Sequence, residues 1–100
     1  MMADATMHVN IVASDHPVWS GDAKSVTIPA YSGGMGILPG HEPVLTVIRE
    51  GDLVVVDPSG ARHSFEVTDG FISFDSNKLT VVIESARSIS NQKLDESGIG

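Results

Sequence analysis

Cysteine is missing from this sequence, and basic side chains are scarce. Without a thiol, the chain can form neither a disulfide nor a thiolate metal site. Its 6 Lys and Arg are outnumbered by 13 Asp and Glu, for a net charge of -7, which argues against binding to a nucleic-acid backbone or directly to an anionic membrane. No apolar run approaches the roughly 20 residues of a membrane span, and the first seven residues do not read as a signal peptide. The composition therefore favours a cytoplasmic protein that reaches any membrane through a partner.

Alternating apolar and polar residues are the main pattern that remains. The segment HVNIVAS places Val9, Ile11 and Ala13 on one face, and KLTVVIES repeats the pattern late in the sequence. A period of two is typical of strands with one buried face. A chain of 100 residues supports one domain. We therefore predict an all-β protein, a small β-sandwich of about eight to ten short strands, over residues 7–87.

Turn residues recur at short intervals between these segments and predict where the strands reverse. Asp57-Pro58-Ser59-Gly60 indicates a hairpin within VVVDPSGARHSF, and Asp75-Ser76-Asn77 indicates another within ISFDSNKLTV. No segment before residue 85 has a helical pattern. We expect residues 1–6 to be a flexible N-terminus and residues 88–100 to be a polar, partly disordered tail.

His41 and Glu42, in the segment GILPGHEPVLT (residues 36–46), are the first candidates for catalysis or metal binding. A histidine can act as a base or ligand near neutral pH, and a carboxylate can orient it. However, adjacent residues on an extended segment point to opposite faces, and no histidine pair has the spacing of metal ligands. A small hydrolase or metal enzyme at these two residues is therefore one open alternative.

Other motifs of enzymes and ligand-binding proteins are weak. There is no Gly-x-Ser-x-Gly elbow, and Gly33-Gly34-Met35-Gly36 lacks the Lys-Ser/Thr ending of a phosphate-binding loop. No nucleophile, base or cofactor-binding motif is recognisable. The single tryptophan, Trp19, reads best as a core or rim aromatic. Its alternative is to stack on a sugar or other small ligand beside the loop from Gly33 to His41.

The segment Pro43–Ile48 is more apolar than a half-exposed strand requires. Burial on both faces would explain this composition, and so would an outer face that meets a partner. We predict an apolar patch around residues 41–48.

Several motifs occur together in an order that resembles one known family. An aromatic-Ser-Gly at residues 19–21 precedes a glycine-rich loop, then Gly-Ile-x-Pro-Gly-His-x-Pro at residues 36–43, a glycine at position 51 and Asp-Gly-Phe-Ile at residues 69–72. This order, from about Met7 to Ser85, resembles the N-terminal β-sandwich domain of the epsilon subunit of F-type ATP synthase. The Gly-x-x-Pro-Gly-His-x-Pro segment is the most specific part of the resemblance.

The resemblance implies a non-catalytic subunit without a cofactor, on the central stalk of a proton-translocating complex at the cytoplasmic face of the membrane. Its sandwich would dock on the gamma subunit and on the c-ring and rotate with them, coupling proton flow to ATP synthesis. By their place in the motif, the residues facing gamma would be Ala13, His41, Pro43 and Thr46. The loop facing the c-ring would comprise Ser32, Gly33, Gly34 and Met35.

Two departures from the family pattern affect these expectations. The loop toward the c-ring usually carries acidic residues, whereas Gly34 and Met35 carry no charge here. The family usually adds a C-terminal helical hairpin, but only about fifteen polar residues follow Ser85. We therefore expect no inhibition of ATP hydrolysis by such a hairpin.

Overall fold

The computed structural model describes residues 5–14, 16–30 and 33–89. This part of the chain holds ten strands and no helix, so no helix long and apolar enough to span a membrane occurs among the residues described. The strands are β1 (Met7–Ala13), β2 (His16–Ala23), β3 (Ser25–Ala30), β4 (Gly33–Ile37), β5 (Val44–Ile48), β6 (Gly51–Val56), β7 (Arg62–Val67), β8 (Gly70–Asp75), β9 (Lys78–Ile83) and β10 (Ala86–Ile89).

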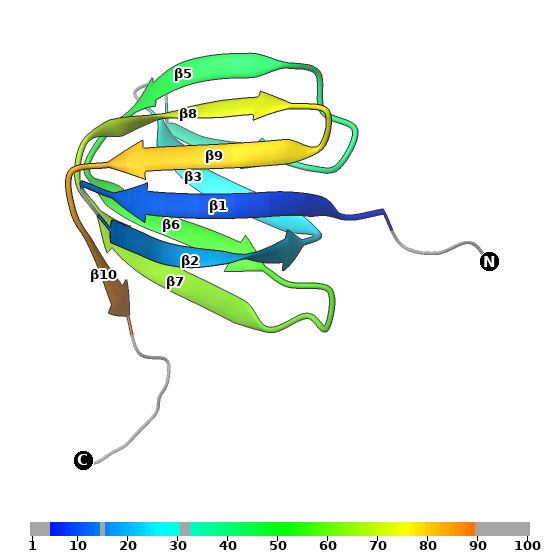
Figure 1. Cartoon of the computed structure of the whole chain (residues 1–100), viewed down its shortest axis with the longest axis horizontal. Coiled ribbons are helices and arrows are strands. Elements are labelled where there is room, and N and C mark those ends of the chain that lie inside the picture. Colours follow the sequence, from blue (N-terminus) through cyan, green and yellow to red (C-terminus); the bar gives the residue numbers. More distant parts are fainter. Residues whose placement is uncertain (1–4, 15, 31–32, 90–100) are drawn as a thin grey trace, which may run out of the picture.

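The strands form one continuous sheet that folds over into two facing layers, as Figure 1 shows. One layer has the order β5-β8-β9-β1-β2, and the other contains β3, β6, β7, β10 and β4, which pairs with β3. The layers join where β3 meets β5, through the pair of Ala30 and Ile48. Beside it, the Arg49 N–H donates to the Pro29 carbonyl oxygen over 2.8 Å. The predicted all-β sandwich is confirmed.

The core lies between the layers and follows the predicted alternation. Val9, Ile11 and Ala13 of β1 are fully buried, while Asn10 and Val12 between them are half-buried. The largest fully buried side chains come from both layers and include Phe74, Met7, Ile28, Ile37, Ile48, Leu53, Ile72 and Leu79.

Both predicted hairpins are present. Strands β6 and β7 are antiparallel around Asp57–Gly60, where the Gly60 N–H donates to the Asp57 carbonyl oxygen over 2.9 Å. Strands β8 and β9 are joined by Ser76 and Asn77, which have φ angles of 52° and 59°. Two successive residues with positive φ form the type I′ turn that suits the twist of a two-residue hairpin.

Other features of the topology were not predicted. β1 runs parallel to β9, with His8 to Ala13 paired against Lys78 to Ile83. β10 crosses the expected boundary between residues 87 and 88 and pairs with β7. The expectations of a flexible N-terminus and a partly disordered tail concern residues that lie mostly outside the described ranges.

Candidate protein-docking surface

The loop that carries the Pro-Gly-His-Glu-Pro motif, residues 38–43, connects β4 and β5 and is shaped by its own backbone. The His41 N–H donates to the Leu38 carbonyl oxygen over 3.0 Å. The His41 ring donates from Nδ1 to the Glu42 carbonyl oxygen over 2.7 Å. Gly40 has a φ angle of 86°, a conformation in which a side chain would be strained. The His41 ring thus bonds to the backbone of the loop rather than to the Glu42 carboxylate.

Two contacts attach this loop to the β8–β9 hairpin. The Gly40 N–H donates to the Asn77 side-chain oxygen, Oδ1, over 2.7 Å. The His41 ring meets the ring of Phe74 edge-on, with centroids 5.9 Å apart and an interplanar angle of 90°. Because Phe74 is buried, the loop rests directly on the core.

Next to the loop, the outer surface of β5 and β8 exposes large apolar side chains. Leu45 and Val47 are 74% and 51% exposed, and Phe71 is 46% exposed. Val47 and Phe71 are direct partners across the two strands, so their side chains share one face. The predicted apolar patch around residues 41–48 is confirmed by Leu45 and Val47, and Phe71 extends it.

The register continues this surface across the whole layer. Phe71 is opposite Val82, Val82 is opposite Val12, and Val12 is opposite Pro17. We call the following residues the outer apolar face: Leu45, Val47, Phe71, Val82, Val12 and Pro17. An apolar row that crosses five strands on the outside of a sandwich marks an interaction surface better than isolated exposed residues do.

The residues predicted to face gamma are not all accessible. Pro43 is exposed and His41 is half-buried at the edge of the outer apolar face. Thr46 is half-buried and alternates with Leu45 and Val47, so it belongs to the inner side of β5. Ala13 is fully buried in the core and has no side-chain surface to offer. The alternation that placed Ala13 beside Val9 and Ile11 already indicated this role.

The loop predicted to face the c-ring is described in part. Ser32 lies outside the described residues. Gly33 and Gly34 are exposed at the start of β4, and Gly33 has a φ angle of 114°. Met35 is half-buried and packs against the core, so the two glycines are the more accessible part of this loop.

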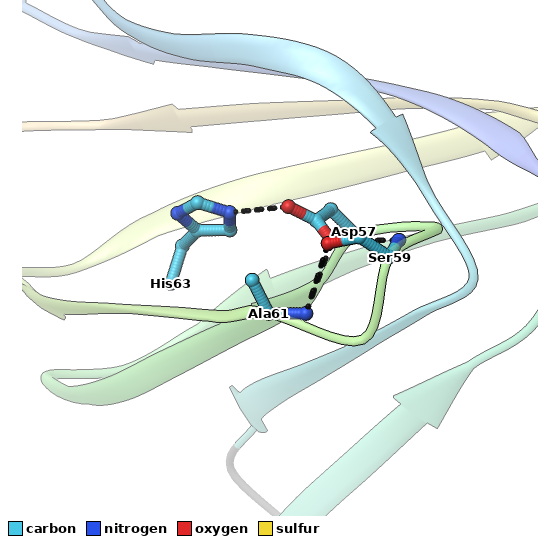
Figure 2. A network of polar contacts seen from close by, with 4 residues as sticks. All are labelled: Asp57, Ser59, Ala61 and His63. Atoms are coloured by element: carbon cyan, nitrogen blue, oxygen red, sulfur yellow. Dashed lines mark hydrogen bonds and ion pairs between the residues drawn. The ribbon is translucent and has the colours of Figure 1, made fainter.

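A polar cluster formed by Asp57, Ser59, Ala61 and His63 lies on the β6–β7 hairpin (Figure 2). Asp57 Oδ1 accepts hydrogen bonds from the Ser59 hydroxyl over 2.6 Å, the Ser59 N–H over 2.9 Å and the Ala61 N–H over 3.1 Å. Asp57 Oδ2 accepts a bond from His63 Nε2 over 2.9 Å. The bonds from Ser59 and His63, with the two backbone N–H groups, hold the pKa of Asp57 well below its ordinary value, against the opposing effect of burial.

This cluster has the residue types of a hydrolase but not the arrangement. The Ser59 hydroxyl donates to Asp57 and not to a histidine base, whereas an activated serine needs a base that takes its proton. Nor do three or more potential ligands gather as a metal site would need within the described part of the chain. The cluster could have been predicted from the sequence, because a hairpin on Asp57–Gly60 places His63 beside Asp57.

Trp19 completes the cluster from the opposite layer. Its ring lies 5.3 Å from the His63 ring, centroid to centroid, and packs against the core. A Cβ atom at Gly21 would lie 3.1 Å from the same indole. Trp19 is therefore a half-buried aromatic at the rim of the core, as the sequence predicts.

Comparison with known families gives the same architecture. A family model described as ATP synthase, Delta/Epsilon chain, beta-sandwich domain, matches residues 6–89. The chain belongs to this family. The resemblance seen in the sequence is thereby confirmed.

Several relatives of this family carry the name ATP synthase epsilon chain. That of Streptomyces avermitilis is 42% identical over 82 residues, which cover 82% of this chain and 66% of the relative. That of Micrococcus luteus is 36% identical over 83 residues, or 83% of this chain and 91% of the relative. The chain thus spans slightly under two thirds of the Streptomyces relative and most of the Micrococcus one.

Solved structures share the fold. A chain in the cryo-EM structure of the Euglena gracilis mitochondrial ATP synthase, OSCP/F1/c-ring, matches with a TM-score of 0.81 at 21% identity, over 84% of this chain and 54% of that one. A chain in the central stalk/c-ring structure of the Tetrahymena thermophila mitochondrial ATP synthase matches with a TM-score of 0.67 at 16% identity, over 86% of this chain and 69% of that one.

Proposed function

We propose that this protein is a non-catalytic rotor subunit on the central stalk of a proton-translocating F-type ATP synthase. It docks on the gamma subunit and the c-ring at the cytoplasmic face of the membrane, as a peripheral part of the complex, and helps to couple proton flow to ATP synthesis. The observation that carries the proposal is the outer apolar face, in a chain of the family whose relatives are named ATP synthase epsilon chain.

A stable partner would cover a substantial share of the surface of so small a domain. A standard interface buries roughly 800 Å² on each side, about one seventh of the 5503 Å² that this chain exposes. A few well-packed residues carry most of the binding energy of an interface. Phe71 and Val47 lie side by side at the β5–β8 end of the outer apolar face, next to loop 38–43 with its exposed Leu38. We therefore assign this layer, rather than the other, to gamma.

Binding to gamma tests the assignment. The double variant Val47→Ser, Phe71→Ser removes apolar area from the outer apolar face, and we expect its affinity for the gamma subunit to fall roughly tenfold or more. Titration of purified gamma by calorimetry would measure this. The matched control is Val54→Ser, which changes a half-buried valine on the outer side of β6 in the other layer. Equal losses in both variants would show that gamma does not recognise this face.

Truncation of a core side chain should lower the stability of the fold without weakening the affinity for gamma. Leu79 is fully buried in β9, so we expect Leu79→Ala to lower the free energy of unfolding by about 2–5 kcal/mol. Because Leu79 contributes nothing to the outer surface, the folded fraction of the variant should bind gamma with unchanged affinity. Urea denaturation and the same titration would separate the two effects. A loss of affinity as large as that of the double variant would contradict the division between core and docking face.

The proposed contact with the c-ring lies at Gly33 and Gly34. The chain has no cysteine of its own, so Gly34→Cys introduces a unique thiol at an exposed position, where a Cβ atom approaches nothing closer than 4.0 Å. Once alkylated with a thiol-reactive photocrosslinker, this position should crosslink on illumination to the polar loop of the c-ring in the assembled complex. A cysteine at exposed Asp52 serves as the control, and crosslinking from Asp52 alone would place the c-ring elsewhere.

The proposed function also concerns ATP hydrolysis. No helix occurs among the residues that the structure describes, and we expect this part of the chain to bind the gamma-containing catalytic head without inserting a helix into it. We expect the rate of ATP hydrolysis to stay unchanged when the chain is added at saturation. Strong inhibition by the same chain would show that the sandwich or its tail regulates the head directly.

A further inference from the structure

We propose that Asn77 is the positioning residue of the docking surface, because it presents loop 38–43 to the partner. The effect of Asn77 on partner binding rests on the proposed function. The attachment of the loop by Asn77 rests on contacts within the chain. Asn77 lies in the turn between β8 and β9, far from the loop in sequence. Its side chain is the group that accepts a hydrogen bond from the backbone of the loop.

Asn77 joins three parts of the molecule. Its Oδ1 accepts from the Gly40 N–H over 2.7 Å, and its carbonyl oxygen accepts from the His8 N–H over 2.8 Å. Its own backbone is one half of the type I′ turn, with a φ angle of 59°. The turn therefore connects loop 38–43 to the start of β1, and both attachments meet at one residue.

Within the described part of the chain, the loop has two other kinds of contact. The bonds from His41 to Leu38 and Glu42 lie within the loop, so they shape it without placing it on the sandwich. The edge-on contact between His41 and Phe74 allows the ring to slide, because such contacts tolerate a range of centroid distances. The hydrogen bond to Asn77 is directional, and it therefore determines how Gly40 and the residues after it lie beside the outer apolar face.

The turn allows this role to be separated from folding. Glycine is favoured at the second position of a type I′ turn, so Asn77→Gly should keep the hairpin and remove the amide alone. Aspartate also adopts the left-handed conformation and offers an oxygen to Gly40, so Asn77→Asp should retain the contact. Ser76→Gly is the matched control, because Ser76 has the neighbouring positive φ angle but no bond to the loop.

The experiment has two readouts on the full chain. The first is the exchange rate and proton chemical shift of the Gly40 amide, measured by NMR without any partner. In Asn77→Gly we expect faster exchange and a shifted resonance, with wild-type values in Asn77→Asp and Ser76→Gly. Thermal stability should be unchanged or raised in Asn77→Gly. An unperturbed Gly40 amide in that variant would overturn the proposal.

The second readout is the affinity for the gamma subunit. Loss of one neutral hydrogen bond and of the loop order that depends on it should weaken binding roughly three- to tenfold in Asn77→Gly, and Asn77→Asp should restore it. A perturbed Gly40 amide with unchanged affinity would remove Asn77 from the docking mechanism. If the wild-type chain itself fails to bind gamma, the proposed function fails, while the NMR result still decides the bond between Asn77 and Gly40.

Discussion

At the scale of single residues, Asp57 carries the clearest electrostatic feature of the described chain. Four donors surround its carboxylate, and they come from Ser59, Ala61 and His63. A carboxylate that accepts several hydrogen bonds is stabilised in its charged form. His63 in turn contacts Trp19 of β2. Asp57 thus fixes both the β6–β7 turn and the side chain that meets the opposite layer.

This arrangement predicts a pH-dependent effect of Asp57→Ala. Because the pKa of Asp57 is lowered in the folded protein, the unfolded chain takes up a proton first as the pH falls. The stabilisation is therefore complete above the unfolded pKa of about 4 and is lost progressively below it. We expect Asp57→Ala to lower the urea midpoint at pH 7, with the difference from wild type shrinking below pH 4. Fluorescence of Trp19, the single tryptophan, provides the measurement.

The control for this prediction is Asp52→Ala, which removes an exposed carboxylate from β6 of the same hairpin. It should change the midpoint little at any pH. A constant difference between Asp57→Ala and wild type from pH 7 down to pH 2 would mean that the variant acts through the turn conformation and not through the charge.

At the scale of elements, close approaches between strands constrain the sequence as much as the core does. Gly70 is the first residue of β8 and is paired with Ile83 of β9. A Cβ atom at this position would lie 2.0 Å from the Val82 carbonyl oxygen. The clash would be with backbone, which cannot rotate away as a flexible side chain can. Gly36 in β4 has nothing within 4 Å of the same virtual atom. The close approach of β9 therefore requires a glycine at position 70, whereas the space around position 36 would admit a side chain.

The pair Gly70→Ala and Gly36→Ala tests this difference. We expect Gly70→Ala to destabilise the protein by about 2 kcal/mol or more, as overpacking against backbone does, and so to lower the melting temperature by roughly 10 °C. Gly36→Ala should change the melting temperature by a few degrees at most. Differential scanning calorimetry of both variants would decide, and equal effects would show that β8 and β9 adjust freely at Gly70.

The sequence predicts where the strands of this protein lie along the chain better than it predicts which strands pair with one another. Alternation gave the inner face of β1 and β9, and turn chemistry gave the hairpins at Asp57–Gly60 and Asp75–Asn77, because both signals are local. The parallel pairing of β1 with β9 and the corner between Ala30 and Ile48 could not be read in this way. A period of two predicts which residues of a strand face inward, but it does not predict which strand pairs with it.

The docking surface was predictable to a similar degree. The motif and its apolar flank drew attention to His41 and to the segment containing Leu45 and Val47. Phe71 and Asn77 belong to motifs that the sequence shows, but their roles in this surface could not be predicted, since these depend on the register of β8 against β5 and on a contact between distant turns. Ala13 was assigned to gamma by its place in the family order, yet its alternation with Ile11 already favoured the core.

At the scale of the whole molecule, the net charge of -7 adds a long-range contribution to partner binding. An excess of carboxylates steers a basic partner during diffusion and affects the association rate more than the affinity. Under the proposed function, we expect the rate of association with gamma to fall steeply with ionic strength, since salt screens exposed charges. The dissociation rate should change little.

Stopped-flow mixing of the chain with gamma at increasing salt would measure both rates. Sucrose at matched viscosity serves as the control for effects of the solution other than screening. An association rate that is independent of salt would show that the carboxylates face away from gamma during the encounter.

The parallel pair of β1 and β9 has a consequence for how the chain reaches its native state. The hairpin of β1 and β2 joins the rest of the sheet through β9, whose residues Lys78–Ile83 are synthesised long after β1. During translation, Val9 and Ile11 can pair with β2 but lack their neighbours on β9 until that strand has been made, and pairing over so large a sequence separation makes folding slow. The sheet can therefore close between β1 and β9 only after residue 83 has been synthesised.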